Sequence, residues 1–149
     1  LYLKCDELND RLFEIQFLSN KCIFSNLTAL YFHGYSNRIP LVYDVTVPRD
    51  YSGSLQHIDN VDLYYVDKEV LNLGVTTIID EFGNELKCYD LERSICDIIK
   101  NKNKLDSELV NKALRQYFFS VNKNPIKLFN YAKKLKVYKK MMEVFEVLS

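Results

Sequence analysis

The strand-forming and helix-forming segments of this chain are separated along the sequence instead of alternating. The strand-like runs lie between residues 41 and 89, and the pattern from Asp90 onward is helical. A doubly wound parallel sheet needs strands and helices that alternate. The sequence therefore predicts an α+β domain with a small mixed or antiparallel sheet of about four strands, helices before the sheet and a helical bundle after it.

The predicted strands are runs rich in β-branched and aromatic residues, at 41–47, 61–66, 75–79 and 86–89. The last two flank a turn at residues 80–84 and predict a hairpin. The segment between Val47 and Val61 carries Pro, Gly and Ser, so we expect an exposed surface loop there.

Apolar residues at helical spacing predict helices over residues 6–19 and 26–33 before the sheet. Ser25 is the expected N-cap of the second helix, and Gly34 is its expected stop. After the sheet, helices are expected to open at Asp90, at Asp106 or Ser107 and at Pro125, and the last helix carries Val137, Met141, Val144 and Leu148.

The formal net charge of zero is the sum of two parts of opposite sign. Residues 1–99 carry eight Lys or Arg and sixteen Asp or Glu, whereas residues 100–149 carry twelve and four, so the two charges are −8 and +8. Within a single domain of residues 1–149, we distinguish an acidic helix and sheet part at 20–99 from a basic helical part at 100–149. The basic part is a candidate anion-binding surface.

The lysines of the basic part form a candidate binding face. The residues concerned are Lys133, Lys136 and Lys140, at i, i+3, i+7 spacing, with Lys134, Lys139, Lys112 and Arg115 as possible extensions. They would share one face if a single helix runs through them. A solvated lysine-rich surface is the plain alternative. The interleaved aromatic residues fall on apolar stripes and are expected in the core, not as a stacking platform for bases.

The sequence carries no motif for nucleotide, metal or covalent chemistry. The four glycines are isolated, which excludes a phosphate-binding loop, and the cysteines and histidines lack metal-site spacing, so we expect neither cofactor nor metal. Gly53-Ser54 followed by Asp59 and Asp62 is weakly similar to the metal-binding pattern of a nucleotidyltransferase. The Asp-x-x-Asp spacing argues against it, because it would aim the two carboxylates in different directions on a strand. There is no apolar run of about 18 residues, so no membrane span or membrane partner is expected. The four cysteines are too sparse for a secreted disulfide framework, so we expect reduced thiols in a cytoplasmic protein.

The densest polar segment is Tyr-Asp-Leu-Glu-Arg-Ser-Ile-Cys-Asp at residues 89–97. Arg93 and Asp97 are four residues apart, so the carboxylate can hold the guanidinium on one helix face. We interpret Glu92 and Arg93 as locking the start of this helix to the sheet. A catalytic use of these groups or of His33 is the alternative, although His33 is expected to interact with the last carbonyls of its own helix.

Several segments, in this order, resemble the C-terminal region of the AbiEi family of antitoxins. They are Ser25-x-x-Thr28 with Ala29-Leu30, His33-Gly34, Arg38 within residues 37–40, the strand 45–48, the turn at Gly83, Tyr89-Asp90-x-Glu92-Arg93-x-x-x-Asp97, and Ala113-Leu114 through residues 131–137. The resemblance spans nearly all of residues 20–149. Ser94 stands where the family tends to have Thr, a change that keeps the hydroxyl.

This resemblance implies a non-enzymatic antitoxin of a bacterial type IV toxin–antitoxin system, which acts in abortive infection and phage resistance. Its partner would be a nucleotidyltransferase-like toxin, which it antagonises directly or indirectly. Family members are also transcriptional regulators that bind their own promoter through an N-terminal winged-helix domain. Residues 1–19 would be the linker helix after such a domain, and promoter DNA would be bound through that domain. The alternative is a nucleic-acid-binding regulatory module that uses the basic C-terminal helices.

Overall fold

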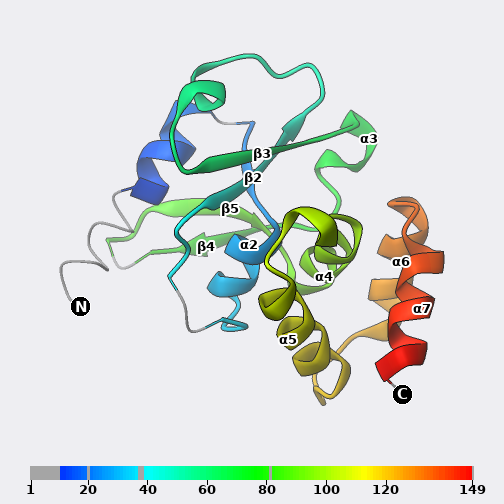
Figure 1. The fold of residues 1–149 in the computed structure, drawn as a ribbon. Helices are drawn as coiled ribbons and strands as arrows, with labels where there is room; N and C mark the ends of the chain where they lie inside the picture. Colours follow the sequence, from blue (N-terminus) through cyan, green and yellow to red (C-terminus); the bar gives the residue numbers. More distant parts are fainter. Residues whose placement is uncertain (1–10, 20, 37–38, 81, 149) are drawn as a thin grey trace.

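The computed structural model describes residues 11–19, 21–36, 39–80 and 82–148, and it confirms the α+β class (Figure 1). Among these residues, five strands form one mixed sheet in the order β3-β2-β1-β5-β4. The strands are β1 (Ile23–Phe24), β2 (Tyr43–Pro48), β3 (Val61–Val66), β4 (Val75–Ile79) and β5 (Glu85–Tyr89). The expected strands are all present, and β1 is an addition that the sequence pattern did not indicate.

The expected helices occur in the expected order, and the short helix at Lys68–Leu71 is an addition that the sequence pattern did not indicate. The helices are one at residues 11–18, α2 (Asn26–Phe32), α3 (Lys68–Leu71), α4 (Leu91–Lys100), α5 (Ser107–Phe118), α6 (Pro125–Lys134) and α7 (Tyr138–Leu148), with short 3-10 helices η1 (Ser54–His57) and η2 (Lys102–Lys104). Figure 1 shows α4 to α7 grouped beside the sheet. The part of the first expected helix at residues 6–10 lies outside the described residues.

The sheet is mixed because β1 sits between two pairs of strands. It runs antiparallel to β2 and parallel to β5, while β2 and β3 are parallel and β4 and β5 form the expected antiparallel hairpin. The connection from β2 to β3 was expected to be an exposed loop. It is largely exposed, but it contains η1 and buries Leu55 against the sheet core.

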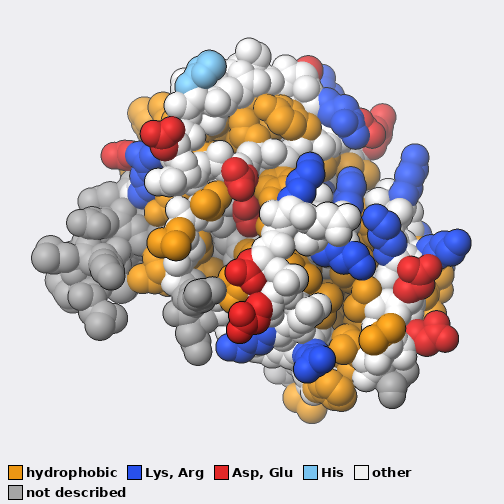
Figure 2. Space-filling view, viewed as in Figure 1, with side chains coloured by type: hydrophobic (Ala, Val, Ile, Leu, Met, Phe, Trp, Pro, Cys, Tyr) orange, Lys and Arg blue, Asp and Glu red, His pale blue; other side chains and the backbone are white. Residues whose placement is uncertain are grey.

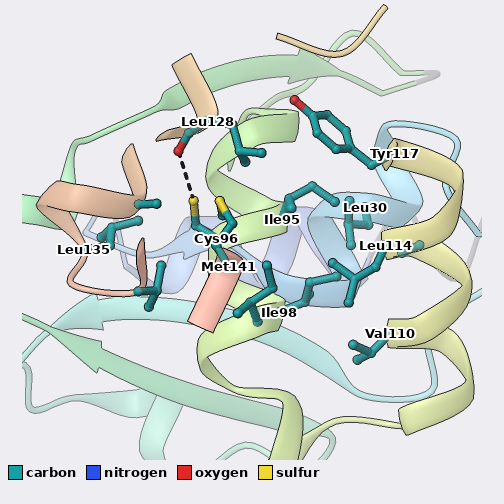
Figure 3. Close-up of a cluster of buried hydrophobic side chains, with 14 residues drawn as sticks. Leu30, Ile95, Cys96, Ile98, Val110, Leu114, Tyr117, Leu128, Leu135 and Met141 are labelled. Carbon is teal, nitrogen blue, oxygen red and sulfur yellow. Dashed lines mark hydrogen bonds between the residues drawn. The ribbon is translucent and has the colours of Figure 1, made fainter. Parts of the chain in front are cut away.

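The core has two clusters. One gathers side chains of α2 and of α4 to α7, where Ile95 and Ile98 on α4 meet Leu114 on α5 (Figure 3). The other lies on the sheet and includes Leu12 and Ile15 from the first helix. The helix at residues 11–18 is thus packed into the core, and its role as a linker to a preceding domain stays a prediction.

The helix at residues 11–18 is also hydrogen-bonded to the sheet through the side-chain amide of Gln16. The Gln16 Nε2 group donates to the Cys22 carbonyl at 3.3 Å, and Gln16 Oε1 accepts from the Lys87 N–H at 2.8 Å. Cys22 directly precedes β1, and Lys87 lies in β5. The Gln16 amide therefore bonds to both strands, next to the short central strand, in the way that a further backbone peptide would.

Helix α2 is capped by a neighbouring strand, which corrects the expectation for Ser25. Ser25 occupies the N-cap position, but its hydroxyl accepts a hydrogen bond from Thr46 Oγ1 on β2 and none from the helix backbone. The Leu27 N–H donates instead to Asp44 Oδ2 on β2 at 3.2 Å, and the Asp44 N–H donates to Thr28 Oγ1 at 2.9 Å. The hydroxyls of Ser25 and Thr28 are both hydrogen-bonded to β2. The side chain that caps the helix is therefore Asp44, which lies 17 positions beyond Leu27.

The end of α2 is the one that Gly34 predicts. Gly34 has a φ of 80°, its N–H donates to the Tyr31 carbonyl, and the Tyr35 N–H donates to the Leu30 carbonyl, which together form a Schellman motif. His33 does not contact the last carbonyls of its own helix with its ring. Its Nε2 atom lies 2.8 Å from the Tyr89 carbonyl oxygen, because α2 packs beside the end of β5.

The same motif ends α6, with a lysine in the place of glycine. Lys136 has a φ of 61°, its N–H donates to the Lys133 carbonyl, and the Val137 N–H donates to the Ala132 carbonyl. The expectation of one continuous helix through Lys133, Lys136 and Lys140 is therefore wrong. The sequence offers no glycine to mark this turn.

Replacing Lys136 by glycine should raise the free energy of unfolding by about 1 kcal/mol, because a side chain at positive φ costs roughly that much. Urea unfolding followed by circular dichroism measures the change. Lys112→Gly, on the exposed side of the α5 interior, is the matched control and should lower the free energy by about 1 kcal/mol. Equal destabilisation by both substitutions would contradict a left-handed turn at residue 136.

The stability of the protein should depend on pH through Asp44. Burial, reinforced by the nearby charge of Asp62 and opposed by the Leu27 hydrogen bond, raises the pKa of Asp44 to about 7. An unfolded Asp ionises near pH 3.9, so between about pH 4 and pH 7 the folded state holds a proton that the unfolded chain has released. This difference lowers the free energy of unfolding as pH rises through that window.

Asp44→Asn should therefore reduce the loss of stability between pH 5 and pH 8 by about 2 kcal/mol, because the amide cannot ionise. Urea unfolding at the two pH values measures this loss. Asp59→Asn removes the same charge at an exposed position and should leave the loss unchanged. An identical pH dependence in Asp44→Asn and the unaltered protein would show that Asp44 ionises as it does in the unfolded chain.

Candidate functional site

The polar segment at the end of β5 and the start of α4 forms a buried group, which we call the junction cluster: Tyr89, Asp90, Glu92, Arg93 and Asp97. Asp90 is the N-cap of α4, as the sequence predicts, since its Oδ1 accepts from the Arg93 N–H at 2.9 Å. Its Oδ2 accepts from the Tyr131 hydroxyl at 2.9 Å and lies 3.0 Å from Lys127 Nζ. One carboxylate thus starts α4 and holds α6.

Glu92 connects α4 to α5. Its Oε2 accepts from the Tyr117 hydroxyl at 3.1 Å, and the Tyr117 oxygen in turn accepts from the Asn124 N–H at 3.0 Å. Glu92 Oε1 lies 3.7 Å from Lys127 Nζ. Hydrogen bonding to Asp90 is the main cause that raises the pKa of Lys127, so this ammonium stays charged beside the two carboxylates.

Arg93 is the largest fully buried side chain among the described residues. Its Nε donates to Asp97 Oδ1 at 3.1 Å, and its Nη1 donates to the carbonyls of Val70 at 2.6 Å and Leu73 at 2.8 Å. The guanidinium carbon lies 4.0 Å from the centre of the Tyr89 ring. Burial raises the pKa of Asp97, and the Arg93 charge and hydrogen bond oppose that shift.

The junction cluster acts as a structural connection. Arg93 and Tyr89 are 0% exposed, Asp97 is 5% exposed and Glu92 is 6% exposed, so a substrate in solution cannot reach these four side chains. Their hydrogen bonds run to α3, to α5 and to the turn before β4. Arg93 agrees with the interpretation that the helix is locked to the sheet, because it packs on the Tyr89 ring of β5 and donates to the Leu73 carbonyl before β4. For Glu92 the interpretation is wrong, because its contacts run to Tyr117 of α5 and Lys127 of α6.

The other residues that carry the AbiEi resemblance also have structural contacts. Ser25 and Thr28 join α2 to β2, Gly34 closes α2, and His33 bonds to the Tyr89 carbonyl. The Ser94 hydroxyl donates to the Asp90 carbonyl at 2.8 Å, which gives the retained hydroxyl a role in the first turn of α4. Arg38 lies outside the described residues.

The candidate basic residues are all exposed, but they do not form one helix face. Lys133 and Lys134 end α6, Lys136 sits in the left-handed turn, and Lys139 and Lys140 begin α7. Figure 2 shows blue side chains gathered over the region where Figure 1 places α4 and α6. The structure therefore divides the expected face among several elements.

Two of these basic residues border a groove of about 600 Å³ between α5 and α7, which we call the α5–α7 groove. Its basic rim consists of Arg115 on α5, Lys140 on α7 and Lys102 on η2, and the acidic residue among its described lining is Glu143. The apolar side chains of the groove are Val110, Leu114, Val144, Val147 and Leu148, and Val147 is 85% exposed. The groove thus combines apolar side chains with an excess of positive charge.

Other basic residues face a different neighbour. A hydrogen bond from Arg49 is the first cause that lowers the pKa of Asp67, and the charges of Lys136 and Lys100 add to it. Lys136 is not among the residues that line the α5–α7 groove. Lys112 lies with Glu108, Asn111 and Arg115 on the outer side of α5.

The apolar stripes of α5 and α7 are not equally buried. Val110 and Leu114 on α5 are buried, whereas Val144 and Leu148 on α7 are only partly covered, and all four line the groove. An exposed Val147 beside Leu148 widens this stripe beyond a simple core face. The adjacent apolar residues Val147 and Leu148 are the sequence feature that could have indicated the groove. Nothing in the sequence pattern indicated that Lys102 and Glu143 line it.

Within the described residues, no group of three or more His, Cys, Asp and Glu side chains could hold a metal ion. A search of the same residues finds no helix with the length and apolar character to cross a membrane. The three described cysteines, Cys22, Cys88 and Cys96, are buried free thiols, and burial raises the pKa of each. Comparison with known proteins finds no matching family model and no matching curated protein.

Loss of the Arg93 guanidinium should be strongly destabilising. Arg93→Met should lower the free energy of unfolding by about 3–5 kcal/mol, because it leaves the Asp97 carboxylate buried without its charge partner. The double variant Arg93→Met/Asp97→Leu should be less destabilised than the single variant, since it also removes the orphaned charge. Urea unfolding measures both.

The matched control is Arg49→Met, which removes an exposed ion pair with Asp67 and should cost about 1 kcal/mol or less. A cost for Arg93→Met no larger than that of Arg49→Met would show that the junction cluster does not hold the fold together.

Proposed function

We propose that this chain is the antitoxin domain of a bacterial type IV toxin–antitoxin pair of the AbiEi kind, and that it counteracts a nucleotidyltransferase-like toxin by binding it, without an enzymatic step, in the cytoplasm. The observation that carries the proposal is the α5–α7 groove. Its basic rim and apolar side chains form a surface for a protein partner.

The groove has the form that accepts a helix of a partner. It runs between two helices, and its apolar side chains offer contacts for residues that repeat every three or four positions along an amphipathic helix. The charges of Lys102, Arg115 and Lys140 favour a partner with acidic residues beside that apolar face. Such complementarity raises the rate of encounter and selects the partner.

Two residues that carry the AbiEi resemblance, Asp90 and Glu92, position the helices around the α5–α7 groove. The Glu92–Tyr117 hydrogen bond holds α5 against α4, and the Asp90 contacts hold α6, from which the chain turns into α7. The two helices that form the groove are therefore positioned by the junction cluster. This gives the Tyr-Asp-x-Glu-Arg segment a role in an antitoxin that needs no catalytic chemistry.

Transcriptional autorepression belongs to the same proposal. In the full-length protein, a winged-helix domain before these residues would bind promoter DNA, and this chain would contribute the toxin-binding part. The helix at residues 11–18, whose Leu12 and Ile15 pack into the core, would then transmit the position of that domain to the sheet.

A second candidate function is nucleic-acid binding by the basic helices. The observation in its favour is the exposed lysine group at the turn between α6 and α7, made of Lys133, Lys134, Lys136, Lys139 and Lys140. Binding of this kind releases counterions and weakens steeply with salt. A gel shift with this chain at two salt concentrations distinguishes it from protein binding, because the antitoxin proposal expects no shift.

Co-expression with the nucleotidyltransferase-like toxin tests the proposal. This chain should restore growth, and the charge-reversed variant Arg115→Glu/Lys140→Glu should lose at least about tenfold in affinity for the toxin and fail to restore growth. Lys133→Glu/Lys134→Glu carries the same charge change outside the groove lining and should still restore growth.

Circular dichroism of both variants should confirm that each is folded. Growth restored equally by the two folded variants would exclude the α5–α7 groove as the binding surface. If the unaltered chain neither restores growth nor binds the toxin, the antitoxin proposal itself is wrong.

A further inference from the structure

A second hollow of about 550 Å³, which we call the acidic pocket, lies where the first residues of β2 and β3 meet the start of α5. It shares no lining residue with the α5–α7 groove. We propose that the acidic pocket binds an arginine side chain of a partner protein, with the guanidinium between Asp44 and Asp62. Neither the antitoxin proposal nor the AbiEi resemblance assigns a role to this pocket.

The two carboxylates come from adjacent parallel strands. Asp44 and Asp62 are register partners in β2 and β3, so their side chains lie on the same face of the sheet. Asp44 is 5% exposed and is held by the Leu27 N–H, whereas Asp62 is exposed. Among the residues that the structure describes, the Asp62 carboxylate has no hydrogen bond or ion pair.

The described lining residues of the pocket carry an excess of negative charge. The charged ones among them are Asp44, Asp62, Asp106 and Lys104. Asp106 already accepts hydrogen bonds from the backbone of α5, as the N-cap of that helix. Lys104 Nζ lies 5.9 Å from the centre of the Tyr64 ring and has no ion pair with a described carboxylate. Asp44 and Asp62 are therefore the pair that a cation can join.

The electrostatics of the neighbouring groups agree with this geometry. Burial is the main cause that raises the pKa of Asp44, and the charge of Asp62 adds to it. The same two carboxylates raise the pKa of Tyr64, after burial. A cation placed between them would remove this repulsion.

The walls of the pocket select arginine. Leu27, Leu105 and Leu109 are among the lining residues and can cover the methylene groups of a long side chain. A planar guanidinium presents several N–H donors and can bridge two carboxylates, whereas an ammonium is a compact and strongly hydrated charge. The combination of paired carboxylates with apolar walls fits the first of these better than the second.

The mouth of the pocket indicates that the arginine belongs to a protein. Leu41 is 88% exposed and Val42 is 40% exposed, and both line the pocket together with Ile39 and Pro40. Exposed apolar residues that adjoin each other mark an interaction surface. A free cation would leave this rim in water, whereas apolar residues on either side of a partner's arginine would cover it.

An NMR titration tests the proposal with the peptide acetyl-Leu-Arg-Leu-amide as the probe. Amide shifts should appear at Leu27, Leu105 and the start of β3. The citrulline peptide keeps the shape without the charge and should bind at least about tenfold more weakly. Asp62→Asn should weaken the arginine peptide by about tenfold as well, while Asp59→Asn, exposed and outside the pocket lining, should not.

Equal affinity of the arginine and citrulline peptides, or an absence of shifts at the pocket, would overturn the proposal. Free arginine amide that binds as tightly as the peptide would overturn the assignment to a partner protein. The variant Arg115→Glu/Lys140→Glu should bind the peptide like the unaltered chain, so a failure here is separate from a failure of the antitoxin proposal.

Discussion

The fold depends on the burial of one guanidinium. Arg93 is removed from water entirely, and a buried charge is tolerated only where hydrogen bonds and an opposite charge replace the lost solvent. Val70 and Leu73 supply two carbonyls, Asp97 supplies the charge, and Tyr89 supplies an aromatic face. The short helix α3 and the turn after it are therefore placed by the needs of a side chain on α4.

The remaining polar contacts of the junction cluster extend this constraint outward. The carboxylate of Glu92 accepts a hydrogen bond from a tyrosine on α5, and that of Asp90 accepts one from a tyrosine on α6. The positions of α5 and α6 are therefore fixed by directional hydrogen bonds as well as by apolar packing. Apolar contacts alone would tolerate small rotations of these helices. Hydrogen bonds do not, because they weaken steeply with angle. The α5–α7 groove thus inherits its shape from residues that never reach its surface.

Much of this fold could be predicted where local chemistry decides it. Gly34 and Asp90 mark helix ends by their own backbone or side-chain properties, and the α+β class follows from the separation of strands and helices. The two-residue strand β1, the cap from Asp44 and the turn at Lys136 could not be predicted, because partners distant in sequence or an unfavourable φ produce them. The same holds for the candidate site. The composition indicated a basic helical part, but the packing of the helices decides which of its lysines and arginines lie beside the α5–α7 groove.

The side-chain amide of Gln16 has a consequence for how this domain can be divided. The central strand is two residues long, and the glutamine completes it by accepting from β5 and donating to the residue before β1. A fragment cut after residue 19 would open a seam in the middle of the sheet and strip Leu12 and Ile15 from its core. The smallest piece that can be produced and studied by itself therefore includes the helix at residues 11–18.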